Sequence, residues 1–314
     1  MRAIAIEAYG GAERLQVMDL PMPQIGPEDV LIRVQAAGVN QADIGFREGL
    51  YAQMMPLSFP AIMGSDFAGT VAQVGERVTT VKVDTRVYGI AWAGGSYAQY
   101  LRVPAAGEVT SRPSALDAVQ AAALPMVGMT ALTAVDSAAL TKEAVFLIVG
   151  GAGGIGSFAI QMAAGQGVHV IATGRAEDQQ YLRRLGASET LDFTQGDVVE
   201  AVRAAHPGGI DAVLDVVTRD WASLAHTAQV LRAGGRLLST VYAVDPAQST
   251  ERGIRAANLV RPQGAEVLDR LSRMVEAGSL WVPVQQTLPL EEAARAQELL
   301  QHGHVRGKLV LTVA

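Results

Sequence analysis

The 314-residue sequence contains no cysteine, which excludes disulfide bonds, thiolate nucleophiles and every cysteine-ligated zinc site. Histidine is also scarce, with 5 residues in the whole chain. The one close pair, His302 and His304, has no acidic third ligand near it in the sequence. We therefore predict that the protein has no metal site.

Long apolar runs and an excess of positive charge are missing as well. No apolar run approaches the roughly 18 residues that cross a bilayer, and the N-terminal stretch "MRAIAIEAYGG" alternates apolar and polar residues without a signal-type core. The formal net charge of -6 gives no electrostatic reason to expect nucleic acid or an anionic membrane as a partner. We expect a cytoplasmic globular protein that binds neither.

The apolar residues, 49% of the chain, fall into two patterns. The first hundred or so residues contain short strand-like runs separated by turn residues, such as "DVLIRVQAAGVN" and "FAGTVAQVG", which predict a mainly antiparallel β domain. From about Asp117 a long helix at 116–140 is followed by Val/Ile/Leu-rich strands that alternate with helices. This alternation is typical of a parallel sheet covered on both faces. The pattern predicts an α/β protein with a doubly wound parallel sheet, and the final strand "GKLVLTV" is expected to complete the first domain.

A glycine-rich segment, "AVFLIVGGAGGIGSFAIQ", lies at 144–161. Gly151, Gly153 and Gly156 have G-x-G-x-x-G spacing between a predicted buried strand and a predicted helix at 154–165. The first glycine permits a tight turn, the second lets the backbone approach a pyrophosphate, and the third lets helix and strand pack closely. Although a glycine-rich turn is the alternative, the strand and helix context favours a dinucleotide and hence a Rossmann domain.

The end of the next strand, "HVIATGR", bears on which dinucleotide is bound. An NAD site usually places an acidic residue there, whereas this chain has Gly174 and Arg175. A guanidinium can hold the 2′-phosphate of NADPH, which favours NADPH as the cofactor. Glu177 could serve instead as a ribose acceptor, and Arg175 could simply be a solvated residue.

Six segments resemble the zinc-free quinone oxidoreductases, the zeta-crystallin group of the medium-chain dehydrogenase/reductase superfamily. They are "AAGVNQADIGFREG" at 36–49, "PAIMGSDFAGTVAQVG" at 60–75, "AAALPMVGMTAL" at 121–132, "VGGAGGIGSFAIQMA" at 149–163, "LRAGGRLLS" at 231–239 and "HGHVRGKLVL" at 302–311. Zinc-dependent relatives have ligands at the positions of Asn40 and Ser65, so the resemblance implies activity without zinc.

The resemblance implies a GroES-like catalytic domain at 1–117 and 263–314, a Rossmann domain at 118–262, and an active site between them. It also implies a homodimer and NADPH-dependent hydride transfer to quinones or other α,β-unsaturated carbonyl compounds. Asn40 and Tyr51 would be the catalytic residues. The cofactor-binding residues would be Asn40, Thr130, Gly151, Gly153, Gly154, Ile155, Gly156, Gly174, Arg175, Val216, Tyr242 and Lys308.

Two family features have no match in this chain. A second pocket tyrosine is missing, because the region nearest the asparagine reads Ile44, Gly45 and Phe46, and Phe193 replaces a tyrosine that helps to hold the adenosine phosphate. Tyr51 is expected either to donate a proton or only to line the substrate pocket. A zinc-free enoyl-thioester reductase, and a non-catalytic NADPH-binding protein with a structural or RNA-binding role, remain as alternatives.

Overall fold

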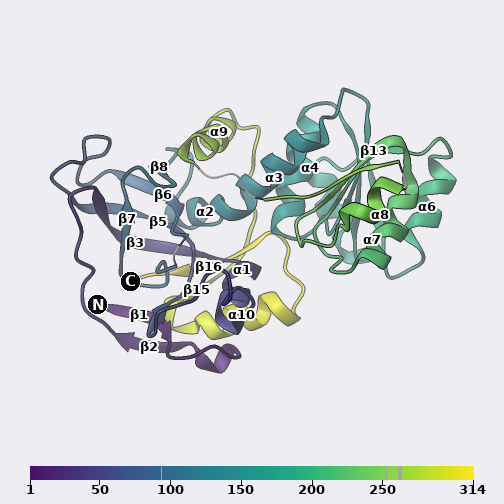
Figure 1. Cartoon of the computed structure of the whole chain (residues 1–314). Helices are drawn as coiled ribbons and strands as arrows, with labels where there is room; N and C mark the ends of the chain where they lie inside the picture. Colours follow the sequence, from purple (N-terminus) through teal and green to yellow (C-terminus); the bar gives the residue numbers. More distant parts are fainter. Residues whose placement is uncertain (93, 252, 261–263) are drawn as a thin grey trace. The chain divides into compact units, whose positions relative to one another are not determined.

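The computed structural model describes residues 1–314 except 93, 252 and 261–263, and for residues 250 and 251 it describes the backbone only. The chain divides into two compact units (Figure 1). Unit 1 comprises Met1–Met126, Gln263–Gly278 and Val282–Ala314, and unit 2 comprises Val127–Pro262 and Ser279–Trp281.

Unit 1 is built on a mainly antiparallel sheet of order β15-β16-β3-β5-β6-β8, with β7 also paired to β3. A smaller sheet has the order β2-β1-β4. The C-terminal strand β16 pairs antiparallel with β3, so the end of the chain completes unit 1 as the sequence led us to expect. The strands are β1 (Arg2–Ile6), β2 (Gln16–Asp19), β3 (Asp29–Val39), β4 (Ala61–Ile62), β5 (Asp66–Val74), β6 (Arg86–Ile90), β7 (Tyr100–Pro104), β8 (Val109–Ser111), β15 (Val284–Pro289) and β16 (Lys308–Thr312).

Two apolar clusters form the core of unit 1. One packs β1, β3 and β16 against the C-terminal helix and includes Ile4, Val39 and Leu311. The other packs β3, β5 and β7 and includes Ile32, Phe67 and Leu101. The helices of this unit are α1 (Gln41–Glu48), α2 (Ala118–Ala122), α9 (Ala265–Glu276) and α10 (Ala293–His302), with 3-10 turns η1 (Ala12–Arg14) and η4 (Leu290–Glu292).

Unit 2 contains a parallel sheet of order β11-β10-β9-β12-β13-β14, flanked by helices (Figure 1). The strand order runs outward in both directions from the β9–β12 pair, which is the doubly wound arrangement predicted from the sequence. The strands are β9 (Val145–Val149), β10 (His169–Gly174), β11 (Glu189–Asp192), β12 (Ile210–Asp215), β13 (Leu231–Ser239) and β14 (Arg255–Asn258). The helices are α4 (Gly154–Gly165), α5 (Gln179–Arg184), α6 (Val198–Ala205), α7 (Trp221–Thr227) and α8 (Pro246–Glu251), with 3-10 turns η2 (Ala176–Asp178) and η3 (Ala228–Val230).

The long helix expected at 116–140 is instead two helices, α2 and α3 (Pro125–Ala138). Pro125 is the first residue of α3, because proline lacks the N–H that a continuous helix would need and disfavours helical backbone in the residue before it. The expectation of one helix was therefore wrong.

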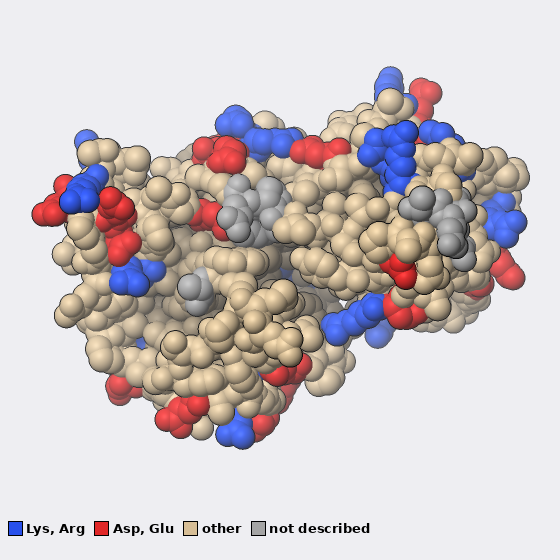
Figure 2. Space-filling view, viewed as in Figure 1, with Lys and Arg blue, Asp and Glu red and all other residues tan. Residues whose placement is uncertain are grey.

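None of the helices in the described part of the chain is long and apolar enough to cross a membrane. On the face drawn in Figure 2, positive and negative side chains are interspersed and most of the surface is uncharged.

Candidate functional site

The glycine loop of unit 2 follows β9 and leads directly into α4. Gly150 has a φ of 87°, in the left-handed region that favours glycine. Its N–H donates to Thr173 Oγ1 at 3.0 Å, and the Gly151 N–H donates to the Thr173 carbonyl at 3.0 Å. These bonds fix the loop to the neighbouring strand β10 at the carboxyl edge of the sheet, where doubly wound proteins bind ligands.

Each of the three positions of the motif is glycine for a different structural reason. A Cβ on Gly156 would lie 2.3 Å from the Gly150 carbonyl oxygen, and one on Gly151 would lie 3.0 Å from Leu182. Packing therefore requires Gly156 and restricts Gly151. A Cβ on Gly153 would meet only the Gly150 oxygen, at an ordinary 3.7 Å. Among the described residues, no atom outside the local backbone excludes a side chain from this position, so the space beside Gly153 fits the approach of a ligand to the backbone.

Gly153 is also the N-cap of α4, and the first helical bond runs from the Ser157 N–H to its carbonyl. The N–H groups of Gly154, Ile155 and Gly156 therefore lie in the first turn of a helix of 12 residues, where they have no carbonyl partner within the helix. Such a turn, with its partial positive charge, suits a phosphate. The glycine loop and the first turn of α4 therefore offer the space and the N–H groups that a pyrophosphate needs.

Gly174 and Arg175 end the next strand at the same edge. A Cβ on Gly174 would lie 2.9 Å from the Cβ of buried Asp178, and Asp178 Oδ2 accepts the Arg175 N–H at 2.8 Å. This turn fixes the Arg175 backbone while its side chain is exposed. The Phe193 N–H donates to the Gly174 carbonyl, so the exposed Phe193 follows β11 beside this turn.

Val216 and Tyr242 follow β12 and β13 at the same carboxyl edge. Val216 packs over the glycine loop, because a Cβ on Gly150 would lie 2.7 Å from its Cγ2. Tyr242 has a φ of 61°, uncommon for a residue other than glycine, and its side chain is 63% exposed. Thr130 is buried within α3. The parallel sheet thus brings together the glycine loop, Arg175, Val216 and Tyr242.

Unit 1 contains a candidate site of its own, which is a buried polar network. Asn40 ends β3 and caps α1, where its N–H donates to Asp43 Oδ2 at 2.9 Å. The Asn40 amide donates to Asp66 Oδ2 at 3.0 Å and accepts from the Lys308 ammonium at 2.6 Å. Asn40 and Lys308 are only 4% and 3% exposed. The ammonium on one side and the carboxylate on the other fix which way the amide faces.

Pairing of strands explains how these residues meet. Leu309 of β16 lies opposite Val39 of β3, so Lys308 comes beside the end of β3 and also donates to the Val39 carbonyl. Asp66 begins β5, which pairs with β3, and its second oxygen accepts the Met126 N–H at 3.0 Å. The network therefore depends on contacts between residues far apart in the sequence.

Burial changes the acidity of all three charged groups. Burial raises the pKa of Asp66 to about 7, although the Lys308 ammonium and the Asn40 amide oppose this rise. Burial likewise raises the pKa of Asp43, which accepts hydrogen bonds from Asn40, Ser65 and Tyr97. Burial lowers the pKa of Lys308 despite the two nearby carboxylates. Two carboxyl groups and one amine thus share a buried site of low dielectric constant. The Asp66 carboxyl, with a pKa of about 7, loses its proton only near neutral pH.

Tyr51 lies close to α1, the helix that Asn40 caps. A Cβ on Gly45 would lie 2.7 Å from the ring of Tyr51, and the rings of Tyr51 and Phe46 have centroids 4.9 Å apart. The absence of a side chain at Gly45, within the region where the family has its second tyrosine, is thus required by the position of Tyr51.

Sequence reasoning missed the contributions of Asp43 and Asp66. Asp66 stands in the "GSD" segment at 64–66, and its only available signal was the comparison with a ligand position in zinc-dependent relatives. Lys308 was assigned to the cofactor; in the structure its ammonium contacts Asn40 and the Val39 carbonyl. Asn40, Ser65 and Asp66 are all held by hydrogen bonds within the protein.

Two family models match the chain. One, described as a zinc-binding dehydrogenase, matches residues 185–311, and the other, described as an alcohol dehydrogenase GroES-like domain, matches residues 26–114. Among curated proteins, a mitochondrial NAD(P)H oxidoreductase of Danio rerio is 30% identical, with 100% of this chain and 91% of the relative covered.

Solved structures agree over nearly the whole length. The quinone oxidoreductase from Coxiella burnetii has a TM-score of 0.93 and 31% sequence identity, covering 100% of this chain and 99% of that one. The Escherichia coli quinone oxidoreductase complexed with NADPH has a TM-score of 0.91 and 26% identity, covering 99% of this chain and 100% of that one.

Proposed function

Since the chain belongs to the zinc-free quinone oxidoreductase group of the medium-chain dehydrogenase/reductase superfamily, we propose that it is an NADPH-dependent reductase of quinones or related α,β-unsaturated carbonyl compounds. The observation that carries the proposal is the glycine loop, in which the space beside Gly153 is explained by a ligand rather than by protein packing. The first turn of α4 would hold the pyrophosphate. Arg175 would hold the 2′-phosphate through a charged hydrogen bond.

NADPH bound at this edge would supply the hydride, and the residues of this chain would position the substrate and stabilise its charge. Hydride addition to a quinone or enone develops negative charge on an oxygen, which preorganised hydrogen-bond donors stabilise. Asn40 has a second amide N–H besides the one given to Asp66, and Tyr51 has a phenolic O–H. We assign these two groups to the substrate oxygen or, for Asn40, to the nicotinamide ribose.

Lys308 would act as a positioning residue in this proposal. Its ammonium holds the Asn40 oxygen and thereby turns the amide nitrogen toward Asp66 and the substrate side. The positions that hold zinc ligands in related dehydrogenases are here Asn40 and Ser65, an amide and a hydroxyl, which are weak neutral ligands for zinc. We therefore propose that catalysis needs no zinc.

A panel of substrates tests the assignment. NADPH oxidation is measured with several quinones, enones and enoyl thioesters in parallel, with NADH as the comparison cofactor. Turnover of quinones or enones with a preference for NADPH supports the proposal. Turnover of thioesters alone identifies an enoyl-thioester reductase instead, and tight NADPH binding without any turnover identifies a non-catalytic protein.

Three expectations from the sequence stay predictions. They are the domain limits (1–117 with 263–314, and 118–262), the homodimer and the cytoplasmic location. Similar proteins include ones named as mitochondrial and one named as a chloroplast envelope protein, so location varies among them.

A further inference from the structure

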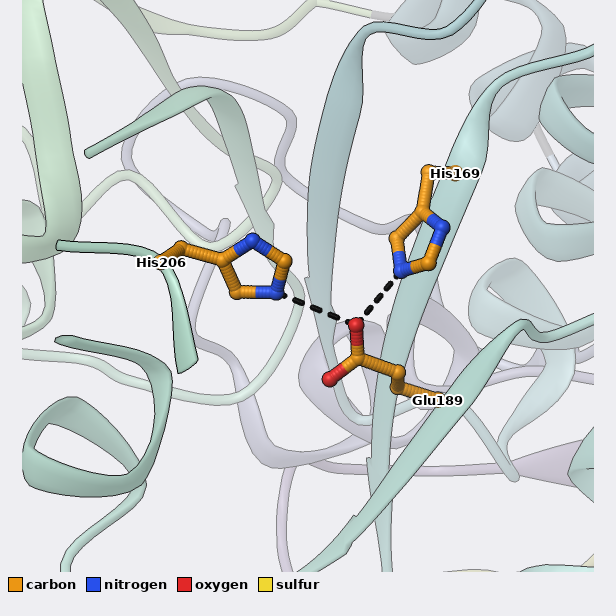
Figure 3. Close-up of side chains that lie close together, drawn as sticks. All are labelled: His169, Glu189 and His206. Atoms are coloured by element: carbon orange, nitrogen blue, oxygen red, sulfur yellow. Dashed lines mark hydrogen bonds and ion pairs between the residues drawn. The ribbon is translucent and has the colours of Figure 1, made fainter. Parts of the chain in front are cut away.

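A second cluster of ionisable side chains lies in unit 2, formed by His169, Glu189 and His206 (Figure 3). His169 is the first residue of β10, Glu189 is the first residue of β11, and His206 follows α6. The Nε2 atoms of His169 and His206 lie 2.5 and 3.0 Å from the same oxygen of Glu189. Three segments that are separate in the sequence therefore aim their side chains at one point.

Although the sequence predicted no metal site, we propose that these three residues form a binding site for a divalent transition-metal ion such as zinc. Imidazole nitrogen and carboxylate oxygen are both ordinary zinc ligands, and three protein ligands leave a fourth position for water. The donor atoms of the cluster lie within 4.8 Å of one another. A tetrahedral zinc ion separates its ligand atoms by about 3.3 Å, so small side-chain rotations would admit the ion.

The backbones that carry the ligands are fixed by hydrogen bonds. The His169 N–H donates to the Ala144 carbonyl at 2.8 Å, and the His206 N–H donates to the Val202 carbonyl at 2.8 Å. Glu189 lies in register with Ile171 of the adjacent strand. A site built on strands and a helix end is already organised before an ion arrives, which reduces the entropy cost of binding.

Charge and access also suit a cation. Glu189 is a carboxylate, whose ordinary pKa lies well below neutral pH, so it offers negative charge to a cation. The side chains of His169, Glu189 and His206 are 39%, 34% and 19% exposed, and His206 also lines a surface hollow of about 570 Å³. An ion would replace the two N–H hydrogens, and each neutral ring would carry its hydrogen on Nδ1 instead.

The position of the cluster assigns the ion a structural role. The three ligands lie at the amino ends of the strands, whereas the glycine loop follows the carboxyl end of β9. The six residues of β10 separate these edges by roughly 17–20 Å, so the ion would not contact the nucleotide. It would instead join β10, β11 and the segment before β12, and would stabilise unit 2.

Zinc titration of the full chain after dialysis against chelator tests the site. Calorimetry at pH 7.5 with zinc chloride should show one bound ion per chain, and saturating zinc should raise the melting temperature by about 5 °C. His206→Ala and Glu189→Gln should each weaken zinc binding at least tenfold, because loss of even an indirect metal partner costs about 10–100-fold. Glu189→Gln keeps the shape of the side chain, so it tests the site even if His206→Ala does not fold. NADPH binding should be unchanged in both variants, which would show that the fold is intact.

His226 provides the matched control. Its Nε2 lies 2.8 Å from Asp197 in the same unit, and among the residues that the structure describes this exposed histidine–carboxylate pair has no third ligand. His226→Ala should leave zinc affinity unchanged, and cobalt(II) should give the intense visible absorption of a tetrahedral site only while the cluster is intact. Zinc binding weaker than about 100 µM in the parent, or equal losses in His226→Ala and Glu189→Gln, would overturn the proposal.

Discussion

The glycine loop of unit 2 and the Asn40–Asp66–Lys308 network of unit 1 are the candidate sites of the two units, and they are built in opposite ways. The loop is one short segment that presents backbone N–H groups, and its conformation depends on glycines that lie next to one another. The network consists of one amide and two charged side chains at the ends of three strands, buried and hydrogen-bonded to one another. Binding by the loop should therefore be sensitive to single methyl groups, whereas the network should be sensitive to charge and pH.

The largest expected effect is the removal of the buried ammonium. Lys308→Met leaves the Asp66 and Asp43 carboxylates without their cation and the Asn40 oxygen without its donor. Breaking a buried ion pair on one side costs about 3–5 kcal/mol, and we expect a loss of that size in the free energy of unfolding at pH 8, measured by urea denaturation. The double variant Lys308→Met/Asp66→Asn should recover part of the loss, because it removes the uncompensated carboxylate as well.

The pH dependence of that loss follows from the raised pKa of Asp66, about 7 in the folded protein. An acidic group whose pKa is raised in the folded protein contributes stability that is present below its unfolded pKa. This stability is lost as pH rises through its folded pKa. In Lys308→Met the folded pKa of Asp66 should rise further, so the two proteins differ in Asp66 ionisation only above about pH 7. The gap in stability should widen from pH 6 to pH 9 by at most about 1.4 kcal/mol per unit. A gap that is constant over this range would show that the ammonium is not paired with Asp66.

The glycines of the loop allow a matched pair of substitutions. Gly156→Ala places a methyl group 2.3 Å from the Gly150 carbonyl oxygen, so the free energy of unfolding should fall by about 1–3 kcal/mol or more. For Gly153→Ala the nearest contact beyond the local backbone, among the described residues, is the Gly150 oxygen at 3.7 Å, so stability should change by less than about 1 kcal/mol. Its methyl group would nevertheless occupy the space assigned to the pyrophosphate, so NADPH affinity should fall at least tenfold. Parent-like NADPH titration of folded Gly153→Ala would remove the loop from the binding site.

Arg175 is a charged side chain at the same edge of the sheet as the glycine loop, which presents backbone N–H groups. It therefore allows the two kinds of contact to be compared within unit 2. One charged hydrogen bond contributes about 1.5–3 kcal/mol, so Arg175→Ala should weaken NADPH binding about tenfold to a hundredfold. NADH binding should hardly change, since NADH lacks the 2′-phosphate. Fluorescence titration of both cofactors measures this directly. An equal loss for both cofactors would contradict the assignment of Arg175.

Tyr51 should show the smallest effect. Loss of one preorganised donor lowers kcat/KM by as much as about 10²–10³, but a quinone pocket open to water would reduce this to a few-fold. Tyr51→Phe should therefore lower kcat/KM for a quinone while NADPH titration stays unchanged. If kcat/KM equals that of the parent for several quinones and enones, Tyr51 only lines the pocket.

The same contrast explains how much of the structure could be predicted. Helix α4 begins at Gly154 and ends at Gly165 as expected, because the glycine spacing and the apolar strand before it are local signals. The parallel order of unit 2 followed from the alternation of strands and helices. The break between α2 and α3 was missed although Pro125 was visible, because the apolar pattern continues through it.

The network of unit 1 could not be derived in this way. Lys308 and Asn40 meet only because β16 pairs with β3 at one register, and no local pattern specifies that pairing. Likewise, His169, Glu189 and His206 lie in three segments that only the parallel sheet brings to one edge. The burial of these side chains depends on the whole fold, whereas the conformation of a glycine loop depends mainly on its own residues.

The most direct test of the whole account is quinone-dependent NADPH oxidation by protein dialysed exhaustively against chelator, with bound zinc determined by elemental analysis of the same sample. The account predicts that kcat/KM for the quinone is unchanged in zinc-free protein, because the amide of Asn40 and the hydroxyl of Ser65 are weak neutral ligands for zinc and the His169 cluster lies at the opposite edge of the sheet from the glycine loop. Only the melting temperature should change: it should fall when zinc is removed and recover when zinc is added back. Activity that disappears with zinc and returns in proportion to its restoration would contradict the account.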